Sequence, residues 1–395
     1  MEIDEIFKIT CEFRLQGKNR EAWAYYLKGI EHSDFTRDKK WGPLFAYEKS
    51  ILAFYNGIPK EEALRDFMVS YSLYKNIEYS NLQYYVFPFP SISSYALPAA
   101  IMDDFIPSST SCIRLGSRIL LNVRYVNYRL QENGSYLMSE NGVLSPHHHI
   151  RTRNFYMFTD PTFTTFSDIN EMFVREEPRH SRNIHGLEDI RIFTKGQDLY
   201  FSATTCEYSH NGNIQEVQGR YDVDGCSFLN IEAMQSPRNA HVEKNWIPLQ
   251  QGYEANASRF IYTWYPFIIG SVHDGHLQFE DDAKLGNDAK LGNDVPYFFK
   301  HIRGSSTLVS HDGYLYTMVH CVIETCPRKY YHMLIKLNPD TYSLVSYTVP
   351  YYFVKNHIEY TLGIHIQDST LTCIVSQNDC NPIIIKMDMN SLIWL

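Results

Sequence analysis

A charged run opens an apolar strand near the middle of the chain. Glu188, Asp189 and Arg191 lie at the head of a β-prone sequence, and a glycine turn and a second apolar run follow. Alternate side chains of a strand point to opposite faces, so we expect Glu188 and Asp189 to diverge and Asp189 to share a face with Arg191. Two interpretations stay open: a polar site at the mouth of a β-fold, or a structural ion pair between Asp189 and Arg191.

A second polar run contains the four consecutive residues Glu243, Lys244, Asn245 and Trp246. A carboxylate, an ammonium, an amide and an indole are the groups that hold sugars, because an aromatic ring covers the apolar face and polar groups bind hydroxyls. The run therefore predicts a sugar-binding site. A tryptophan that fills the core between two sheets is the alternative.

A third run predicts an anion site. Arg303 is followed by Gly304, and two later strands carry His320 and His332. Arginine binds phosphate through a planar two-pronged contact, and glycine lets backbone amides approach the ligand. We expect the three side chains to converge from three strands of one sheet and to hold phosphate. The alternative is that the histidines are ordinary core residues.

Further polar residues complete the predicted site. Glu359 and Glu243 are candidates for a second carboxylate. The candidate substrate ligands include Arg124, Asn127, Arg153, Glu188 and Arg191. The three consecutive histidines at 147–149 follow a Ser-Pro pair, and neighbouring histidines rarely face one ion, so we interpret them as a solvated loop. We expect neither a metal nor a cofactor.

The composition restricts the class of protein. The chain has 395 residues, a formal net charge of −9 and no apolar run long enough to span a membrane, which argues against a general nucleic-acid binder and an integral membrane protein. The acidic N-terminus lacks a signal-peptide pattern, and the eight cysteines form no CxxC pair. We expect reduced thiols and a cytoplasmic location.

The N-terminal part, residues 1–90, reads as helical. Apolar residues recur at helical spacing in four stretches, separated by glycine, asparagine and proline. They predict two antiparallel hairpins similar to tetratricopeptide repeats, too few for a free-standing solenoid, so we expect them to pack on the rest of the chain. Residues 91–109 are rich in proline and serine and are predicted to be a linker.

Residues 110–395 read as short strands with turn signals and contain a loose repeat. Each unit opens with a polar cluster and continues with strands around a glycine turn. Five such openings predict a five-bladed β-propeller, so that the chain is mainly β with a small helical segment in front. The openings are Ser109–Ser111, Leu187–Arg191, Glu243–Trp246, Arg303–Ser306 and Ile358–Thr361. A tandem hexapeptide at 283–294 is interpreted as a duplication in a surface loop.

The openings, in this order, resemble a known group of proteins. The run Glu188-Asp189-Ile190-Arg191 is similar to the Glu-Asp-Pro-Arg of mannoside phosphorylases and related mannosyltransferases, which are five-bladed propellers with a single aspartate as proton donor. Isoleucine stands here in place of the proline. Other runs are similar to propeller proteins that accompany glycosyltransferases in bacteria and large DNA viruses, often behind a helical segment. These runs are residues 122–128, 243–248, 303–306 and 330–332.

The resemblance implies a carbohydrate-active protein. In the enzymatic hypothesis Asp189 donates a proton to the glycosidic oxygen, Tyr331 and the other polar residues bind the sugar, and the Arg303 cradle holds phosphate, a sugar phosphate or a nucleotide sugar. Hydrolysis would require a second carboxylate, whereas phosphorolysis would not. The alternative is a non-catalytic propeller that binds a glycan or a protein and assists a partner glycosyltransferase. Propellers host both roles.

Overall fold

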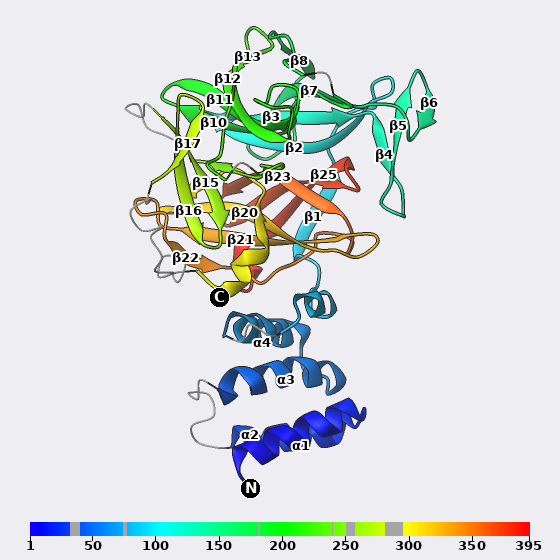
Figure 1. The fold of residues 1–395 in the computed structure, drawn as a ribbon, viewed down its shortest axis with the longest axis vertical. Coiled ribbons are helices and arrows are strands. Elements are labelled where there is room, and N and C mark those ends of the chain that lie inside the picture. Colours follow the sequence, from blue (N-terminus) through cyan, green and yellow to red (C-terminus); the bar gives the residue numbers. More distant parts are fainter. Residues whose placement is uncertain (32–39, 74–76, 181, 239, 250–256, 281–294) are drawn as a thin grey trace.

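The computed structural model describes residues 1–31, 40–73, 77–180, 182–238, 240–249, 257–280 and 295–395. The helices form a stack at the N-terminal end, and the strands form a larger body beyond it (Figure 1). Within the described residues, no helix is long and apolar enough to cross a membrane. All eight cysteines are free thiols.

Four α-helices follow one another in the described part of the N-terminal segment. They are α1 (Ile3–Leu15), α2 (Asn19–Ile30), α3 (Trp41–Tyr55) and α4 (Lys60–Leu73), and a 3-10 helix, η2 (Tyr79–Tyr84), comes next. α1 packs on α2, and α3 packs on α4, as the hairpin pattern predicts. Gly17 and Gly57 follow two of these helices with φ angles of 73° and 74°, a conformation that glycine adopts without strain. Their likeness to tetratricopeptide repeats stays a prediction.

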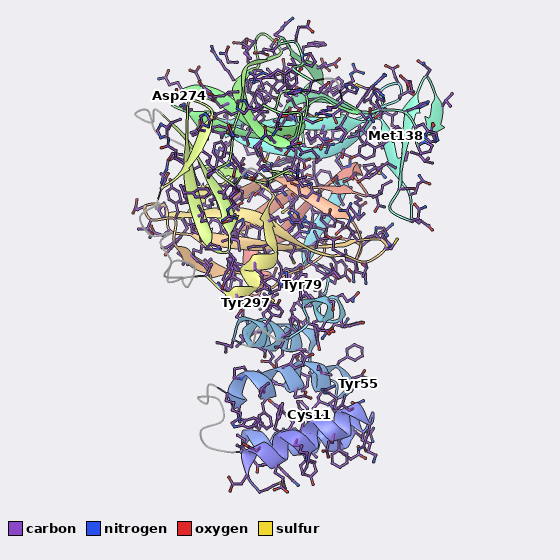
Figure 2. All side chains as sticks on the ribbon, viewed as in Figure 1. Cys11, Tyr55, Tyr79, Met138, Asp274 and Tyr297 are labelled. Carbon is purple, nitrogen blue, oxygen red and sulfur yellow. The ribbon has the colours of Figure 1, made fainter. Side chains whose placement is uncertain are left out.

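The second half of the helical segment shares a core with the β body. Phe67 and Tyr71 of α4 and Leu82 of η2 are buried in the same cluster as Phe298 and Met333. Tyr71 also stacks on Tyr297 at 5.9 Å between ring centroids, and Figure 2 shows Tyr79 and Tyr297 where the two parts meet. The expectation that this segment packs on the rest of the chain is confirmed.

Most of the described strands form five antiparallel units, four of them with four strands and one with five. The first contains β2 (Ile106–Leu115), β3 (Arg118–Val126), β7 (Ile150–Thr159) and β8 (Asn170–Val174). The second contains β10 (Glu188–Lys195), β11 (Asp198–Thr205), β12 (Gln215–Asp222) and β13 (Ser227–Ala233). The third contains β14 (Ile247–Pro248), β15 (Ser258–Trp264), β16 (Phe267–His273) and β17 (His276–Phe279).

The last two units complete the ring. The fourth contains β18 (Ile302–Gly304), β19 (Val309–His311), β20 (Tyr314–Ile323), β21 (Lys329–Leu337) and β22 (Leu344–Tyr347), with β18 and β19 both along β20. A short 3-10 helix, η4 (Tyr297–His301), precedes this unit, and another, η5 (Met389–Ser391), lies near the C-terminus. The fifth contains β23 (Glu359–Gln367), β24 (Thr370–Gln377), β25 (Cys380–Asp388) and β1 (Ser91–Ala96).

The first strand of each unit lies on the inside of the ring. β2 contacts both β10 and β23, β10 contacts β14, and β19 contacts β23. This is the arrangement of a β-propeller with five blades among the described residues. The polar openings predicted from the sequence lie in these inner strands or, for Glu243–Trp246, directly before one of them, which is why polar side chains from different blades gather near one axis.

One boundary was predicted wrongly. The segment 91–109, expected to be a linker, contains β1, which pairs antiparallel with β25 from Ser91 opposite Met387 to Ala96 opposite Ile383. β1 closes the fifth blade with the N-terminal side of the chain. Its serines are mostly exposed because it is an edge strand, so its composition resembles that of a linker.

A small sheet is inserted in the first blade and was not predicted. It contains β4 (Tyr128–Leu130), β5 (Tyr136–Glu140) and β6 (Val143–Ser145), and it projects from the propeller (Figure 1). Asp104 holds this inserted sheet in place by accepting hydrogen bonds from Ser139 Oγ at 2.6 Å and Gly142 N at 2.8 Å. His147 and His149 are exposed in the loop after β6, and β9 (Ile184–His185) pairs with β7. The hexapeptide repeat at 283–294 lies outside the described residues.

Candidate functional site

Arg124 joins the first two blades by binding two carboxylates of the β10 opening. Its Nη1 lies 3.0 Å from Asp189 Oδ1 and its Nη2 lies 3.0 Å from Glu188 Oε1. Ser109 Oγ also donates to Asp189 Oδ1 at 3.1 Å. Arg124 is buried, while the side chains of Glu188 and Asp189 remain 28% and 21% exposed. The two carboxylates are therefore held in place and still reach solvent.

A β-bulge brings these carboxylates together. The pairing of β10 with β11 shifts register between Glu188 and Arg191, and Asp189 has a φ angle of 50°. The bulge interrupts the alternation of side chains, so Glu188 and Asp189 both point to Arg124 instead of diverging. Our prediction from regular alternation was wrong at this point, and the predicted Asp189–Arg191 carboxylate pair is replaced by Asp189–Arg124.

Arg191 is a fully buried link between blades. Its Nε donates to Ser305 O at 2.8 Å, its Nη2 donates to Tyr360 OH at 3.0 Å, and its Nη1 donates to the backbone oxygen of Asp189 at 3.2 Å. Asn245 Oδ1 lies 3.5 Å from Nη2. The guanidinium thus fixes the bulge and three other inner segments. Arg191 was predicted as a substrate ligand, but its donors are directed to the protein.

Glu216 of β12 is a buried acid that the sequence analysis missed. Its Oε1 accepts a hydrogen bond from Trp246 N at 3.3 Å. Burial raises its pKa to about 7, against the opposing effect of the Arg191 charge. A glutamate in the polar sequence at the start of β12 gave no distinguishing signal, because its proximity to Arg191 depends on the ring of blades.

This shift predicts a pH-dependent stability. The folded pKa of Glu216 is raised from its usual value of 4.5 to about 7. The stabilisation that the protonated carboxyl group gives the folded state is therefore complete below about pH 4.5 and is lost as the pH rises through about 7. The difference in free energy of unfolding between Glu216→Gln and wild type should shift in favour of the variant by up to about 3 kcal/mol when the pH is raised from about 5 to about 8. Denaturant unfolding at both pH values measures this. Glu177→Gln, at an exposed position, is the control; an equal pH response in both variants would contradict the assignment.

Arg303, His320 and His332 form one row across the fourth blade. Arg303 of β18 lies opposite His320 of β20, which lies opposite His332 of β21. Cross-strand neighbours share a face of an antiparallel sheet. The residues therefore have the relative placement expected from the sequence, although their role as a phosphate site stays a prediction.

Only one member of this row supplies an accessible charge. His320 is buried with Nδ1 2.7 Å from Ser305 Oγ, and His332 is 0% exposed. Burial lowers the pKa of His320 well below its usual range and lowers that of His332 to about 3. Both rings are thus neutral at neutral pH, and Arg303 alone is exposed. His332 is a core residue in this conformation, contrary to the predicted cradle of three ligands.

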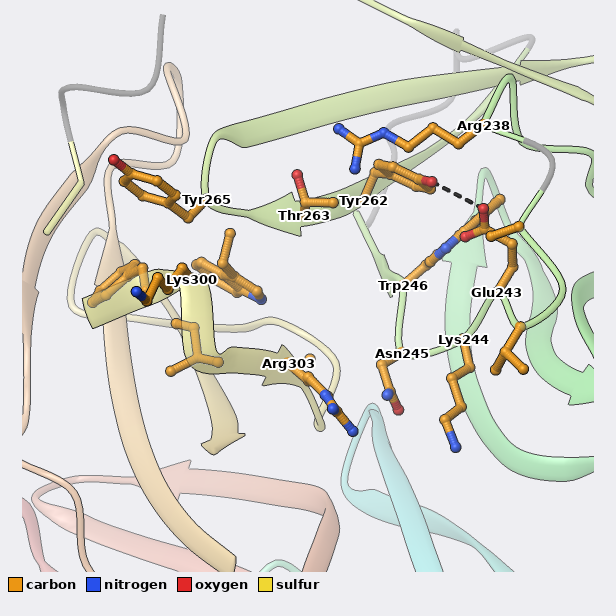
Figure 3. Close-up of a pocket in the computed structure, with 16 residues that line it drawn as sticks. Arg238, Glu243, Lys244, Asn245, Trp246, Tyr262, Thr263, Tyr265, Lys300 and Arg303 are labelled. Carbon is orange, nitrogen blue, oxygen red and sulfur yellow. Dashed lines mark hydrogen bonds between the residues drawn. The ribbon is translucent and has the colours of Figure 1, made fainter. Parts of the chain in front are cut away.

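A pocket of about 470 Å³ lies beside Arg303 between the third and fourth blades. Lys244, Asn245 and Arg303 line it and extend toward the same side (Figure 3). Lys244 and Arg303 are exposed, and among the described residues neither forms an ion pair. Asn245 connects this pocket to the buried contacts of Arg191, since its Oδ1 also lies 3.4 Å from Tyr360 OH. Lys244 thus adds a second cation next to Arg303.

Trp246 and Glu243 have structural contacts. Trp246 is buried and packs on Tyr262 and Phe260, with ring centroids 5.2 and 6.0 Å apart. Glu243 is buried and accepts a hydrogen bond from Tyr262 OH at 3.0 Å (Figure 3). Trp246 is therefore a core residue, which was the alternative interpretation of its sequence. Glu243 does not face the two carboxylates that Arg124 binds. The regular alternation of strand side chains could not predict these directions, because Asn245 has a φ angle of 68° and interrupts the extended backbone.

Glu359 anchors a loop. Its carboxylate accepts hydrogen bonds from the backbone N–H groups of Phe353 at 2.6 Å, Val354 at 3.0 Å and Lys355 at 2.9 Å. The residue is buried, and its acceptor positions are occupied by its own chain. Glu359 was a candidate for a second catalytic carboxylate, and these contacts do not leave it available for that role.

Asn127 and Arg153 are engaged in the first blade. The Asn127 side chain donates to Ser139 O and His149 O at 3.0 Å each and accepts from Arg151 N at 2.7 Å. Arg153 forms a two-pronged ion pair with Glu171. Both were predicted as substrate ligands, but their polar atoms hold the inserted sheet and the strand pairing instead.

Tyr331 points away from the row formed by Arg303, His320 and His332, whereas its neighbour Tyr330 lies against that row. Tyr331 is fully buried and donates to Asn356 Oδ1 at 2.8 Å. Tyr330 stacks on His320 with 5.6 Å between centroids and an interplanar angle of 14°. Strand alternation from His332 would have identified Tyr330, two residues away, as the tyrosine on the same face.

A second acid, also missed, lies near Arg124. Tyr128 OH donates to Asp379 Oδ2 at 3.4 Å. Burial raises the pKa of Asp379 and the Arg124 charge opposes that rise. Asp379 lies in the β24–β25 turn, far from Arg124 in sequence, so only the closure of the ring brings them near. Within the described residues, no group of three or more His, Cys, Asp or Glu could hold a metal ion.

Comparison with known proteins gives similar structures but no similar sequence. No protein-family model matches the chain, and no curated protein matches it. A β-1,2-mannobiose phosphorylase from Listeria innocua, in complex with β-1,2-mannobiose, has a TM-score of 0.47 and 10% identity over 76% of this chain and 98% of its own. A mannose phosphorylase from Leishmania mexicana, in complex with phosphate, has a TM-score of 0.44 and 12% identity over 75% of this chain and 88% of its own.

A third similar structure belongs to the GH130 family of mannoside phosphorylases, which contains glycoside hydrolases that target β-1,2-mannosidic linkages in Candida mannan. It has a TM-score of 0.49 and 7% identity over 78% of this chain and 97% of its own.

Proposed function

We propose that the protein transfers glycosyl groups between a sugar and phosphate, with Asp189 as the proton donor and with Arg303 and Lys244 as phosphate ligands. The observation that supports this most directly is that the propeller has a solvent-reaching carboxylate, Asp189, and two exposed cations without an ion-pair partner among the described residues. Asn245 lines the pocket with these cations and also contacts Arg191, which holds the Asp189 bulge.

Phosphorolysis suits this site better than hydrolysis. Hydrolysis by two carboxylates requires a second free carboxylate at a suitable separation. Glu243 and Glu359, the two candidates from the sequence, bind Tyr262 and three backbone N–H groups, and Glu188 is held in an ion pair with Arg124. In phosphorolysis bound phosphate is the nucleophile, so one acid is sufficient. The same site would serve transfer from a sugar phosphate.

Arg124 and Glu188 are proposed to position Asp189 and to control its proton. An opposite charge favours the ionised form of a carboxyl group. Arg124 uses a separate nitrogen for each carboxylate, so it can keep Glu188 as its partner while Asp189 carries a proton. Glu188 is proposed to remain the partner of Arg124, at 3.0 Å, when Asp189 donates its proton.

A non-catalytic glycan-binding propeller is the second candidate. The observation that favours it is the Arg124 contact itself, because it neutralises both carboxylates of the opening in this conformation. In this role the same cations would bind an anionic sugar without chemistry, and the protein would assist a partner glycosyltransferase.

Phosphate dependence tests the proposed function. Wild-type protein is incubated with manno- and gluco-configured disaccharides, β-1,2-mannobiose among them, with and without inorganic phosphate, and sugar 1-phosphate is measured. We expect phosphate-dependent release, and we expect Arg303→Ala to raise the KM for phosphate about tenfold or more because a charge-assisted contact is lost. The exposed Arg118→Ala in β3 is the control. Binding of a disaccharide without turnover of any donor would favour the non-catalytic candidate.

A further inference from the structure

Two cavities meet at two basic residues, Lys300 just before β18 and Arg303 within it. The first is the pocket of about 470 Å³ described above, which we call the inner cavity. The second, which we call the outer cavity, has a volume of about 420 Å³ and lies at the junction with the helical segment. Lys300 and Arg303 line both. The two cavities therefore lie on either side of the same pair of cations.

The helical segment supplies a wall of the outer cavity. Tyr79 and Ser80 of η2 line it together with His301 and Glu324 of the fourth blade. Tyr79 stacks flat on His301 at 3.7 Å between centroids and an interplanar angle of 4°. His301 Nε2 lies 2.6 Å from Tyr71 OH. These contacts fix the wall, which gives the helical segment a place in a binding surface as well as in the core.

The lining of the cavities is basic although the chain as a whole is acidic. The inner cavity has four cationic residues and one carboxylate, Glu243, which is buried against Tyr262; the outer cavity adds one carboxylate, Glu324. The cations are Arg238, Lys244, Lys300 and Arg303. The formal net charge of the chain is −9, so this surface departs from the average and favours an anionic ligand.

Aromatic rings alternate with these cations. Tyr265 is partly exposed in the inner cavity next to Lys300 (Figure 3), and Arg238 lies over the Tyr262 ring at 5.2 Å. Sugar rings bind aromatic faces through their C–H groups, while cations bind phosphate or carboxylate substituents. The combination of both along one surface suits a glycan better than it suits a polyanion without apolar faces.

We propose that the inner and outer cavities form one groove that binds an extended, phosphate-bearing glycan. The reacting end lies at Asn245 and Arg303, next to the Asp189 site, and the rest of the chain continues past Lys300 to Tyr79. This inference rests on the proposed function for the direction of the ligand. It extends that function by assigning a polymeric substrate class and a binding role to the helical segment.

The groove predicts that affinity depends on chain length. Isothermal titration of the 395-residue chain uses a manno-disaccharide and a manno-hexasaccharide, each with one terminal phosphate monoester, and the same sugars after dephosphorylation. We expect the phosphorylated hexasaccharide to bind about tenfold or more tightly than the disaccharide, since it occupies both cavities. Ser80→Trp, which fills the outer cavity from an exposed position, should remove that difference and leave disaccharide affinity unchanged.

Charge variants test the same groove independently. Lys300→Gln should weaken hexasaccharide binding about two- to fivefold, as expected for an exposed ion contact. The control is Lys8→Gln on α1, where the lysine side chain is 77% exposed at the far end of the helical segment (Figure 1). Equal affinity for both chain lengths, or binding of an acidic peptide as tight as that of the hexasaccharide, would overturn the groove. Because the readout is binding, Asp189→Asn should keep the length dependence even if turnover is lost, which separates this proposal from the proposed reaction.

Discussion

Asp189→Asn is expected to lower turnover by about 10²- to 10⁴-fold, the range that a positioned general acid contributes. Asparagine keeps the size of the side chain and tolerates the φ angle of 50° at the bulge. Its Oδ1 can still accept the hydrogen bond that Ser109 Oγ donates at 3.1 Å. Arg124 also retains Glu188 as a partner at 3.0 Å. The variant therefore removes the transferable proton and leaves the shape of the site.

The measurement compares phosphate-dependent release of sugar 1-phosphate with disaccharide affinity in the same protein. We expect kcat to fall while affinity stays close to that of wild type. Asp198→Asn, a surface substitution on the neighbouring strand β11 with a side chain 58% exposed, is the control. Full activity of Asp189→Asn would remove the acid assignment, and Glu188→Gln would then show whether the neighbouring carboxylate has that role.

The sequence contained enough information for the propeller because its signals are local. A polar cluster, a short strand, a glycine turn and a second strand recur in each unit, and the structure places Gly116, Gly196 and Gly313 in such turns with φ angles of 61°, 64° and 75°. Ring closure by β1 was not predictable from these signals. It depends on pairing between residues 91–96 and 383–387, which no local pattern records.

The site was harder to predict because function depends on which polar side chains lack a partner in the protein. Glu359 and Asn127 have the residue types of ligands, yet backbone groups saturate them. Lys244 and Arg303 have similar types and remain exposed. The bulge at Asp189 further reverses the direction of one side chain. Both facts follow from contacts between blades, so residue type and spacing alone could identify the openings but could not sort their members.

Deletion of residues 1–87 is expected to give insoluble or aggregating protein. This truncation retains β1, so the fifth blade can still close. It removes Phe67, Tyr71 and Leu82, which are buried in one cluster with Phe298 and Met333 of the fourth blade and its preceding segment. Exposing a large apolar surface favours association. Soluble expression and size-exclusion chromatography measure the outcome, and a monodisperse, folded truncation would contradict it.

A pair of point variants separates loss of this interface from general damage by truncation. Phe67→Ala should lower the free energy of unfolding by about 3–5 kcal/mol, since it leaves a cavity in a shared core. Leu73→Ala lies on the same helix at 66% exposure and should change it by no more than about 0.5 kcal/mol. Denaturant unfolding followed by both the helical and the β-sheet circular-dichroism signals tests whether the helical segment and the propeller unfold as one unit. If the helical segment and the propeller share one core, both signals should shift together in Phe67→Ala; a shift confined to the helical signal would show that the segment is a separate unit.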